Sequence, residues 1–345
     1  MIPIQNIYYM LSYAFQVLNE QGYKNIATEQ FNNTGELMAA ILEKGIAIQL
    51  KRGLGKEYIL QTEALSSLRG KIDIAESIKT QSMLRKQLIC TYDEFSVNSI
   101  MNRIIKSTVE LLLRSNISKQ RKKNLRKLMV YFSEVDFIDL YTVNWNVQYN
   151  RNNQTYHMLI SICYLVVKGL LQTQSNGHTE LMDFLDEQRM CRLYEKFILE
   201  YYRKEFKNQF TANASQIPWQ LDNEENSMLP VMQSDIMLQS GEKVLIIDAK
   251  YYEHSTQVQF DKHTLHSGNL YQIFTYVKNK EYELREKDHT VSGMLLYAKT
   301  DEEIYPNNVY QMSGNQITVR TLDLNLPFDE IAGQLNTIAK THFDL

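Results

Sequence analysis

The sequence predicts an α/β protein in two parts: an α+β N-terminal region with a small β-rich insert, and a C-terminal mixed sheet flanked by helices. Three observations predict this class. Apolar residues recur at steps of three and four over several long segments, short β-rich pieces broken by glycines lie at about 46–75, and strands alternate with helices in the last third of the chain. A length of 345 residues leaves room for two or three domains.

The N-terminal part should be mainly helical. A helical pattern starts at Pro3, and a second helix is expected over 35–46. Gly53, Gly55 and Gly70 then punctuate the β-rich insert, which we expect to form a small sheet or barrel. The remaining expected elements of this part are a helix over 98–115, the solvated face of a helix in the basic stretch 118–127, and an apolar helix after the polar turn 150–154.

We place the domain boundary in the polar loop 174–180. The first domain is then 1–175, with its insert at about 46–75, and the second domain is 176–345. After the boundary the pattern predicts a helix over about 187–207, strands at 229–238 and 243–252, a helix over about 268–280, strands near 291–298 and 309–322, and a terminal helix from about 328.

The composition excludes several classes of protein. Lys and Arg number 37 against 40 Asp and Glu, so any contact with nucleic acid must be local or shared with a partner. Cys90, Cys163 and Cys191 are widely spaced, which fits a reducing compartment and argues against a disulfide framework. The N-terminus lacks the features of a signal peptide, and the longest apolar run, 158–167, is too short to span a bilayer. We therefore expect a soluble, cytoplasmic protein without membrane contact.

The stretch "LIIDAKYY" (245–252) places Asp248 and Lys250 in an otherwise apolar strand, although charges are costly to bury without partners. Residues 229–252 read as a hairpin. If its turn centres on Ser240 and Gly241, Asp235 faces Ile246 and becomes the diagonal neighbour of Asp248. The two carboxylates and the ammonium of Lys250 then share one face of the sheet.

This arrangement suits a hard divalent cation, Mg²⁺ or Mn²⁺, bound by Asp235 and Asp248. A metal held there polarises a phosphodiester and lowers the pKa of a bound water, while Lys250 orients that water or stabilises developing charge. The alternative is that Asp248 and Lys250 form an ion pair on an edge strand of the sheet. For a DxK tripeptide taken alone, this alternative is the better interpretation. The upstream aspartate, the acidic helix before the hairpin and the polar-faced helix after it favour the metal site.

A third acid could come from the helix at 191–206. Glu195 and Glu200 flank opposite sides of its apolar stripe, so one of them is expected to reach the sheet, and the pattern does not decide which. In the following helix Gln272 and Tyr276 lie four residues apart on one face and could hold substrate phosphates or bases. A half-buried helix with two polar side chains is an equally good interpretation of that pair.

Asp235, Asp248-Ala249-Lys250 and Gln272-Ile-Phe-Thr-Tyr276 together resemble the PD-(D/E)xK nuclease pattern with the Q-x-x-x-Y motif of its RecB-like branch. The sequence departs from that pattern before Asp235, where "MQSD" has no proline. More closely, the whole chain resembles the McrC family, the nuclease subunits of McrBC modified-cytosine restriction systems. The stretches that carry this resemblance are "IPIQNIYYMLSYAF" at the start, "NRIIKST" (102–108), "VLIIDAKYY" (244–252) and "NLYQIFTYV" (269–277).

The resemblance implies a metal-dependent DNA endonuclease that cuts DNA containing modified cytosine. It implies association with a hexamer of a McrB-like AAA+ GTPase, whose hydrolysis the nuclease subunit stimulates. We assign docking of this partner to residues 1–175. Carried over to this chain, Asp235 and Asp248 become metal ligands, joined by the backbone carbonyl of Ala249, and Lys250 becomes the catalytic lysine.

Two other functions stay open: a stand-alone RecB-like exonuclease of DNA repair, and a non-catalytic activator of the GTPase. Arg52, Arg69 and Arg103 are candidates for acting on a partner's GTP in trans, although ordinary surface arginines are the better interpretation of each. No P-loop occurs, so the chain should not hydrolyse nucleotide itself. The loop histidines His254, His263 and His266 are better explained by a solvated loop than by a metal pair.

Overall fold

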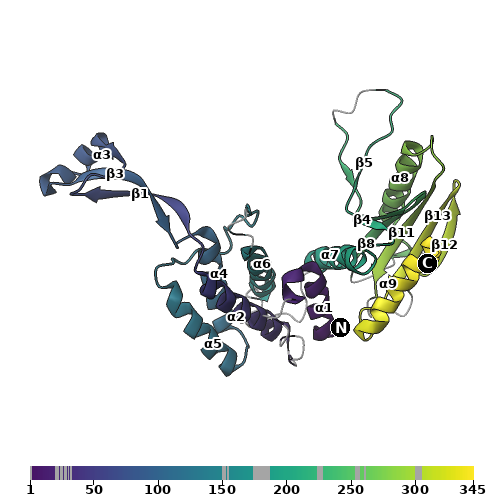
Figure 1. Ribbon diagram of the computed structural model, residues 1–345, viewed down its shortest axis with the longest axis horizontal. Helices are drawn as coiled ribbons and strands as arrows, with labels where there is room; N and C mark the ends of the chain where they lie inside the picture. The colour runs from purple at the N-terminus through teal and green to yellow at the C-terminus, as the bar shows by residue number, and fades with distance from the viewer. Residues whose placement is uncertain are drawn as a thin grey trace. The chain divides into compact units, whose positions relative to one another are not determined.

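The structure is a computed structural model of the chain. It describes residues 2–19, 23, 26, 29, 31, 33–149, 153, 155–173, 187–223, 228–252, 257–259, 262–299 and 305–345. The chain divides into two compact units, one made of Met1–Phe31 with Phe184–Leu345 and the other of Asn32–Asp183 (Figure 1).

The division therefore differs from the predicted one, in which 1–175 and 176–345 were continuous. The predicted boundary lies outside the described residues. The N-terminal segment packs with the C-terminal unit because its aromatic side chains find partners there: Tyr9 stacks on Phe328 at 4.4 Å between ring centroids, and Tyr13 lies 5.3 Å from Tyr201. A linear pattern does not reveal such a long-range contact.

The unit Asn32–Asp183 is built on packed helices. These are α2 (Thr34–Arg52), α4 (Ile100–Arg114), α5 (Lys119–Met129, followed by the short helix η4 Val130–Phe132) and α6 (Tyr156–Thr173). Helix α2 runs six residues beyond its predicted end at 46, so the β-rich interpretation of residues 46–52 was wrong. Gly45, Ile46 and Gln49 continue the buried face at helical steps, and Gly53 ends the helix with φ 92°. Burial of this stripe outweighs the strand preference of its β-branched residues.

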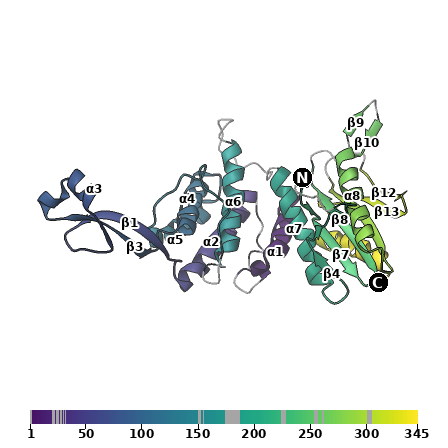
Figure 2. The ribbon, with the colours of Figure 1, turned by 90° about the horizontal axis from the view of Figure 1, so that it is seen from above.

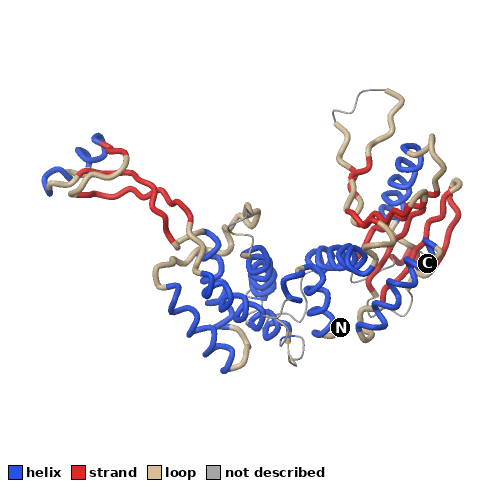
Figure 3. The backbone as a smooth tube through the Cα atoms, viewed as in Figure 1, coloured by secondary structure: helices blue, strands red, loops and turns tan. Residues whose placement is uncertain are grey.

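An antiparallel sheet extends from these helices. It comprises β1 (Glu57–Leu65), β2 (Lys71–Asp73) and β3 (Leu88–Ser96) in the order β1-β3-β2, with α3 (Ile74–Lys79) and the short helix η3 (Ser82–Arg85) between β2 and β3. We call residues 57–96 the arm (Figure 3). The predicted insert is thus a sheet, but it spans 57–96 rather than about 46–75. Gly70 is required in it, because a Cβ there would lie 2.3 Å from the carbonyl oxygen of Thr91.

A buried hydrogen-bond clamp fixes the root of the arm. The Asn102 amide on α4 donates to the carbonyl oxygens of Gly55 (2.9 Å) and Val97 (2.8 Å), which flank the arm at its two ends. The Tyr156 hydroxyl on α6 donates to Asn102 Oδ1 at 2.7 Å and accepts from the Gly55 N–H at 2.7 Å. Both side chains are buried. The "NRIIKST" stretch therefore begins with a residue that ties the arm to the helices.

The other unit contains a six-stranded mixed sheet in the order β12-β13-β11-β8-β7-β4, with β8, β11 and β13 parallel. Its strands are β4 (Thr211–Asn213), β7 (Ile236–Ser240), β8 (Lys243–Lys250), β11 (Thr290–Ala298), β12 (Asn308–Met312) and β13 (Asn315–Leu322). Two smaller pairs are β5 (Gln216–Ile217) with β6 (Met232–Gln233), and β9 (Gln257–Gln259) with β10 (Lys262–Thr264), the latter standing apart from the main sheet (Figure 2).

Helices cover both faces of this sheet. Helix α8 (Ser267–Glu283) packs on the face that carries Val244 and Ile246, where Ile273 and Val277 join the core. Helix α7 (Glu187–Glu205) packs on the opposite face, where Tyr194 meets Tyr251. The remaining helices of this unit are α1 (Ile4–Ala14), the short η1 (Gln16–Asn19) and α9 (Phe328–Phe343).

The α/β class is confirmed, and most predicted elements of this unit form. The expected strand region 309–322 is a hairpin, β12–β13, whose turn places Ser313 and Gly314 at positive φ. Strands β4, β5, β9 and β10 were not predicted because they are two or three residues long, too short to show a period. No described helix is long and apolar enough to cross a bilayer.

Candidate active site

The turn of the β7–β8 hairpin sets a strand register that differs from the predicted one. Its two connecting residues are Gly241 and Glu242, because Gly241 takes the positive φ of 57° that the turn needs. Gln239 consequently pairs with Val244, not with Glu242, and the register shifts by two residues. The predicted pairing of Asp235 with Ile246 was therefore wrong, since Met237 pairs with Ile246. Asp235 lies just before β7, and its carboxyl reaches the end of β8 beside Asp248.

Asp248 and Lys250 form a buried ion pair. The ammonium nitrogen of Lys250 lies 3.0 Å from Asp248 Oδ1 and 2.9 Å from Oδ2, and Asp248 is 1% exposed. Burial alone lowers the pKa of Lys250, but the Asp248 carboxylate more than offsets this, so the pKa is raised. Strand β8 lies between β7 and β11, so this pair does not sit on a sheet edge.

Asp235 carries the most perturbed carboxyl of the group. Burial, and next the repulsion from Asp248 and Glu195, raises its pKa from 3.8 to about 8. Its Oδ2 accepts the backbone N–H of Ala249 at 2.9 Å, which holds the carboxyl against the end of β8. Two repelling carboxylates at a partly closed site are a recurring property of cation-binding and catalytic sites.

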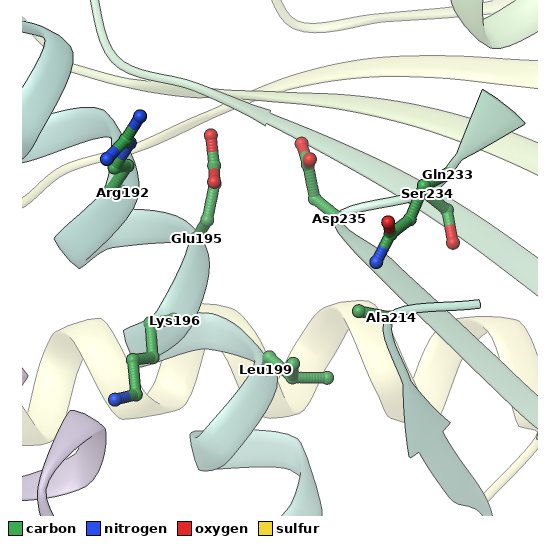
Figure 4. Close-up of a pocket in the computed structure, with 8 residues that line it drawn as sticks. All are labelled: Arg192, Glu195, Lys196, Leu199, Ala214, Gln233, Ser234 and Asp235. Carbon is green, nitrogen blue, oxygen red and sulfur yellow. The ribbon is translucent and has the colours of Figure 1, made fainter. Parts of the chain in front are cut away.

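The structure brings Glu195, not Glu200, to the aspartates. Burial raises the pKa of Glu195. The negative charge of Asp248 raises this pKa further, and the positive charge of Lys250 lowers it, so Glu195 lies within the electrostatic reach of both groups. Glu200 instead pairs with Arg203 on its own helix at 2.7 Å. Figure 4 shows the carboxylates of Glu195 and Asp235 projecting in the same direction from facing elements.

A cleft of about 430 Å³ opens beside these groups. It lies between α7 and the segment leading into β7, so the carboxylates of Glu195 and Asp235 are reached from solvent through it. Its lining residues are Arg192, Glu195, Lys196, Leu199, Ala214, Gln233, Ser234 and Asp235 (Figure 4).

Gln272 contacts Lys250, and Tyr276 contacts Gln272. The amide oxygen of Gln272 accepts from Lys250 Nζ at 3.3 Å, and its amide nitrogen donates to the Tyr276 hydroxyl at 2.9 Å. Tyr276 is 8% exposed and packs in the hydrophobic core between α8 and the sheet. The geometry therefore supports an orienting role toward Lys250 better than the predicted contact with phosphates or bases.

The donor set suits a hard divalent cation, although no three His, Cys, Asp or Glu side chains of the described residues already converge as a metal cage. Asp248 Oδ2 is buried and lies 2.9 Å from the Lys250 ammonium nitrogen, and the Asp248 carboxyl also interacts with that of Asp235. Carboxylate oxygens with open coordination positions for water and phosphate are what Mg²⁺ and Mn²⁺ prefer. Asp235, Asp248 and Glu195 would hold the ion, with the Ala249 carbonyl beside them.

Two side chains of the site were missed in the sequence. The Cys191 thiol donates to Glu195 Oε1 at 3.0 Å and lies 4.0 Å from the Ala249 carbonyl oxygen. Arg192 lines the cleft three residues before Glu195. Cys191 and Arg192 precede Glu195 by four and three residues, a spacing that places side chains close together on one helix. The sequence could have indicated their place in the site only if Glu195 had already been chosen over Glu200.

The remaining candidates lie elsewhere. Arg69 stacks over the Tyr92 ring of the arm at 4.1 Å, Arg103 donates to the Phe137 carbonyl at 3.4 Å, and Arg52 is an exposed residue in the last turn of α2. The His266 ring lies 5.3 Å from that of Tyr252. His254 and the side chain of His263 fall outside the described residues.

Comparison with known proteins agrees with the resemblance of the motifs. The family model described as McrBC 5-methylcytosine restriction system component matches residues 5–298. The chain belongs to this family. A similar protein from Escherichia coli K12, the type IV methyl-directed restriction enzyme EcoKMcrBC, is 30% identical over 329 residues, covering 94% of this McrBC-family chain and 93% of the relative.

Two solved assemblies from Thermococcus gammatolerans resemble this McrBC-family chain more distantly. One, a half-complex of McrB AAA+ hexamers with bound McrC, matches with a TM-score of 0.48 and 18% identity over 97% of this chain and 76% of that chain. The other, a McrBC complex, matches with a TM-score of 0.42 and 22% identity over 59% of each chain.

Proposed function

We propose that this McrBC-family chain is the nuclease subunit of a GTP-driven restriction complex, and that it hydrolyses DNA containing modified cytosine with Mg²⁺ or Mn²⁺. One observation carries the catalytic part: the carboxyls of Asp235, Asp248 and Glu195 lie near enough for their charges to interact, and Lys250 pairs with Asp248. Family membership supports the restriction context.

Each side chain has a task in this proposal. A bound cation would polarise a phosphodiester and supply a hydroxide at neutral pH. Asp235, Asp248 and Glu195 would hold the ion, which removes the repulsion among their carboxylates. Lys250, oriented by Gln272 at 3.3 Å, would donate a hydrogen bond to the attacking water or to the phosphate oxygen on which charge develops.

The proposal includes a partner, a hexamer of a McrB-like AAA+ GTPase whose hydrolysis this chain stimulates. The relative from E. coli is named as a McrBC enzyme, and the T. gammatolerans structures contain McrB with McrC. Within residues 1–175, we assign docking to the arm, because large apolar side chains gather on its surface at high exposure. They are Tyr58, Leu60, Leu68, Ile72, Ile74, Ile78, Met83, Leu84 and Phe95.

Substitution in the site separates catalysis from activation of the partner. Asp248→Ala and Lys250→Ala should abolish cleavage of a methylated plasmid by the assembled complex while GTP hydrolysis by the partner stays stimulated. Asp288→Asn, an exposed aspartate on the same unit, is the matched control. Normal cleavage by Asp248→Ala would show that the site is assigned wrongly.

A second function, activation of the GTPase without nuclease activity, is favoured by one observation. The carboxylates of the site already have partners within the chain: Asp248 with Lys250, Asp235 with the Ala249 N–H, and Glu195 with Cys191. Calorimetric titration of the chain with Mn²⁺ distinguishes the two, since a vestigial site should show no saturable binding. A stand-alone exonuclease would instead degrade DNA ends without GTP or the partner.

A further inference from the structure

The cleft beside Glu195 is lined by an arginine, Arg192, that has no role in the proposed catalytic chemistry. Arg192 lies on α7, one turn before Glu195, and its side chain is exposed. Among the residues that the structure describes, its guanidinium has no hydrogen-bond or ion-pair partner. Figure 4 shows it projecting in the same direction as the Glu195 and Asp235 carboxylates, at the opposite end of the row from Asp235.

The second cation of the cleft is directed elsewhere. Lys196 lies on the same wall, but its ammonium points away from the carboxylates in Figure 4 and sits 4.2 Å from the centroid of the Phe15 ring. Burial lowers its pKa. Lys250, the third cation of the site, is already paired with Asp248. Arg192 is therefore the cation that remains available at the mouth of the cleft.

An anion entering this cleft meets the carboxyl groups of Glu195 and Asp235, with the buried Asp248 close to Asp235. Carboxylates repel a DNA phosphate, and a bound divalent ion would offset this repulsion at the reacting phosphate itself. A neighbouring phosphate of the same strand lies outside that ion's coordination and needs a positive group of its own. A guanidinium serves well because its fork of N–H donors pairs with two phosphate oxygens at once.

We propose that Arg192 is a substrate-binding residue that holds a backbone phosphate of the DNA strand at the mouth of the cleft, adjacent to the phosphate being cut. The contact orients the strand along α7, so that the scissile phosphate meets the aspartates. This inference rests on the proposed nuclease function. It assigns no base recognition to Arg192, since phosphate contacts set position rather than sequence.

The decisive experiment measures two quantities on Arg192→Gln. Mn²⁺ affinity is measured on the isolated full chain by the loss of the free-ion electron paramagnetic resonance signal. Cleavage of methylated DNA is measured on the complex with its GTPase partner, at DNA concentrations below saturation. We expect cleavage to fall roughly tenfold or more, the usual effect of losing a charge-assisted hydrogen bond. Mn²⁺ should bind as tightly as before or more tightly, because a positive charge beside the carboxylates has been removed.

Opposite responses of the two readouts are the signature of the proposed role. A residue that merely positions Glu195 would lower both, so a joint loss of Mn²⁺ binding and cleavage overturns the inference. Unchanged cleavage by Arg192→Gln overturns it as well. Arg192→Lys should recover part of the activity, since an ammonium keeps the charge but not the fork.

Lys196→Met supplies the matched control, because it removes a charge from the same wall while keeping an unbranched apolar stem. It should cleave close to the wild-type rate; a loss equal to that of Arg192→Gln would indicate a general field effect and not a phosphate contact. The dependence of cleavage on salt should also weaken in Arg192→Gln by about one released counterion. Failure of the nuclease proposal is recognised separately, by wild-type protein that neither binds Mn²⁺ nor cuts DNA.

Discussion

Asp235 and Asp248 come together where the β7–β8 pairing ends. The pairing stops at Ile236 and Ile247, and Asp235, the residue before β7, accepts the backbone N–H of Ala249 through its Oδ2 at 2.9 Å, which sets its carboxyl beside that of Asp248. The two carboxyls therefore repel each other in the absence of a cation. Lys250 neutralises Asp248, which leaves Asp235 to respond by holding a proton.

This repulsion predicts a pH-dependent stability of the metal-free chain. Burial, and next the Asp248 charge, raises the pKa of Asp235 to about 8, whereas the unfolded chain releases this proton near 3.8. The stability that the protonated carboxyl contributes is thus fully present below pH 3.8 and is lost as the pH rises toward 8. In EDTA, urea unfolding of the wild type should weaken across this window, and Asp235→Asn should lack that component.

The same experiment distinguishes the carboxyl from other titrating groups. In a Trp145→Phe background Trp219 is the remaining tryptophan, and its fluorescence reports on the unit that contains the site. Asp288→Asn is the control and should follow the wild-type pH profile. Mn²⁺ should restore stability at pH 8 to the wild type and not to Asp235→Asn. Identical pH profiles for wild type and Asp235→Asn would contradict the prediction.

A second prediction concerns Cys191, which positions the third carboxylate. Its thiol donates to Glu195 Oε1 at 3.0 Å, and burial, then the hydrogen bond to Glu195, raises its pKa to about 12. The thiol therefore stays protonated and keeps its donor. Cys191→Ser retains a donor and should bind Mn²⁺ nearly as well as the wild type, whereas Cys191→Ala should bind it several-fold more weakly, as expected for the loss of one hydrogen bond.

Calorimetric titration with Mn²⁺ at fixed pH measures both variants. Cys90→Ala, in the arm, is a control for the removal of a buried thiol from another unit. Equal affinities for Cys191→Ser and Cys191→Ala would mean that the thiol fills space and does not orient Glu195.

The clamp at the root of the arm gives a third prediction. The Tyr156 hydroxyl satisfies both the Gly55 N–H and Asn102 Oδ1, so Tyr156→Phe leaves two buried polar groups without this partner. The cost in unfolding free energy should be about 1–3 kcal/mol. Because the arm is then held less firmly, stimulation of the partner's GTP hydrolysis should fall by more than the loss of stability explains.

The matched variant is Tyr202→Phe, which removes a buried hydroxyl that donates to the Leu335 carbonyl at 3.0 Å in the other unit. It should lose stability and retain GTPase stimulation at a temperature where both variants are folded. Equal stimulation by the two variants would assign the clamp a structural role alone.

The sequence was sufficient to predict which side chains of the site lie together on one element, because that depends on local periods. Alternation in the strand places Asp248 and Lys250 on one face, and a spacing of four places Gln272 and Tyr276 together on α8. The register of the hairpin could not be predicted from the sequence, because it depends on which two residues form the turn. Both Ser240–Gly241 and Gly241–Glu242 are plausible turn residues in the sequence. The structure shows Gly241 and Glu242 as the turn residues, with Gly241 at a positive φ.

The choice between Glu195 and Glu200 could not be predicted from the sequence for a different reason. They are five residues apart on α7 and so point about 140° apart around the helix. Which one meets the aspartates depends on how α7 is rotated on the sheet, and that rotation is set by contacts such as Tyr194 with Tyr251 and Tyr202 with the Leu335 carbonyl. These contacts join segments distant in the chain, so no local pattern encodes them. The extension of α2 over 46–52 was missed for the same reason, because burial of Ile46 overrides its strand preference.

The last prediction tests the arm as the docking surface. Leu84 is 81% exposed on the short helix between β2 and β3, so it contributes little to the fold. If the GTPase partner buries it, Leu84→Ser should weaken assembly by about 1 kcal/mol or more, because the burial of an exposed leucine side chain is lost. Val130, 71% exposed in the same unit but outside the arm, offers the control Val130→Ser, which should assemble normally.

Sedimentation of the complex at several partner concentrations measures the assembly of both variants. Mn²⁺ binding by the isolated chain should be unchanged in each, because the site lies in the other unit. Equal assembly by Leu84→Ser and wild type would place this part of the arm outside the contact surface.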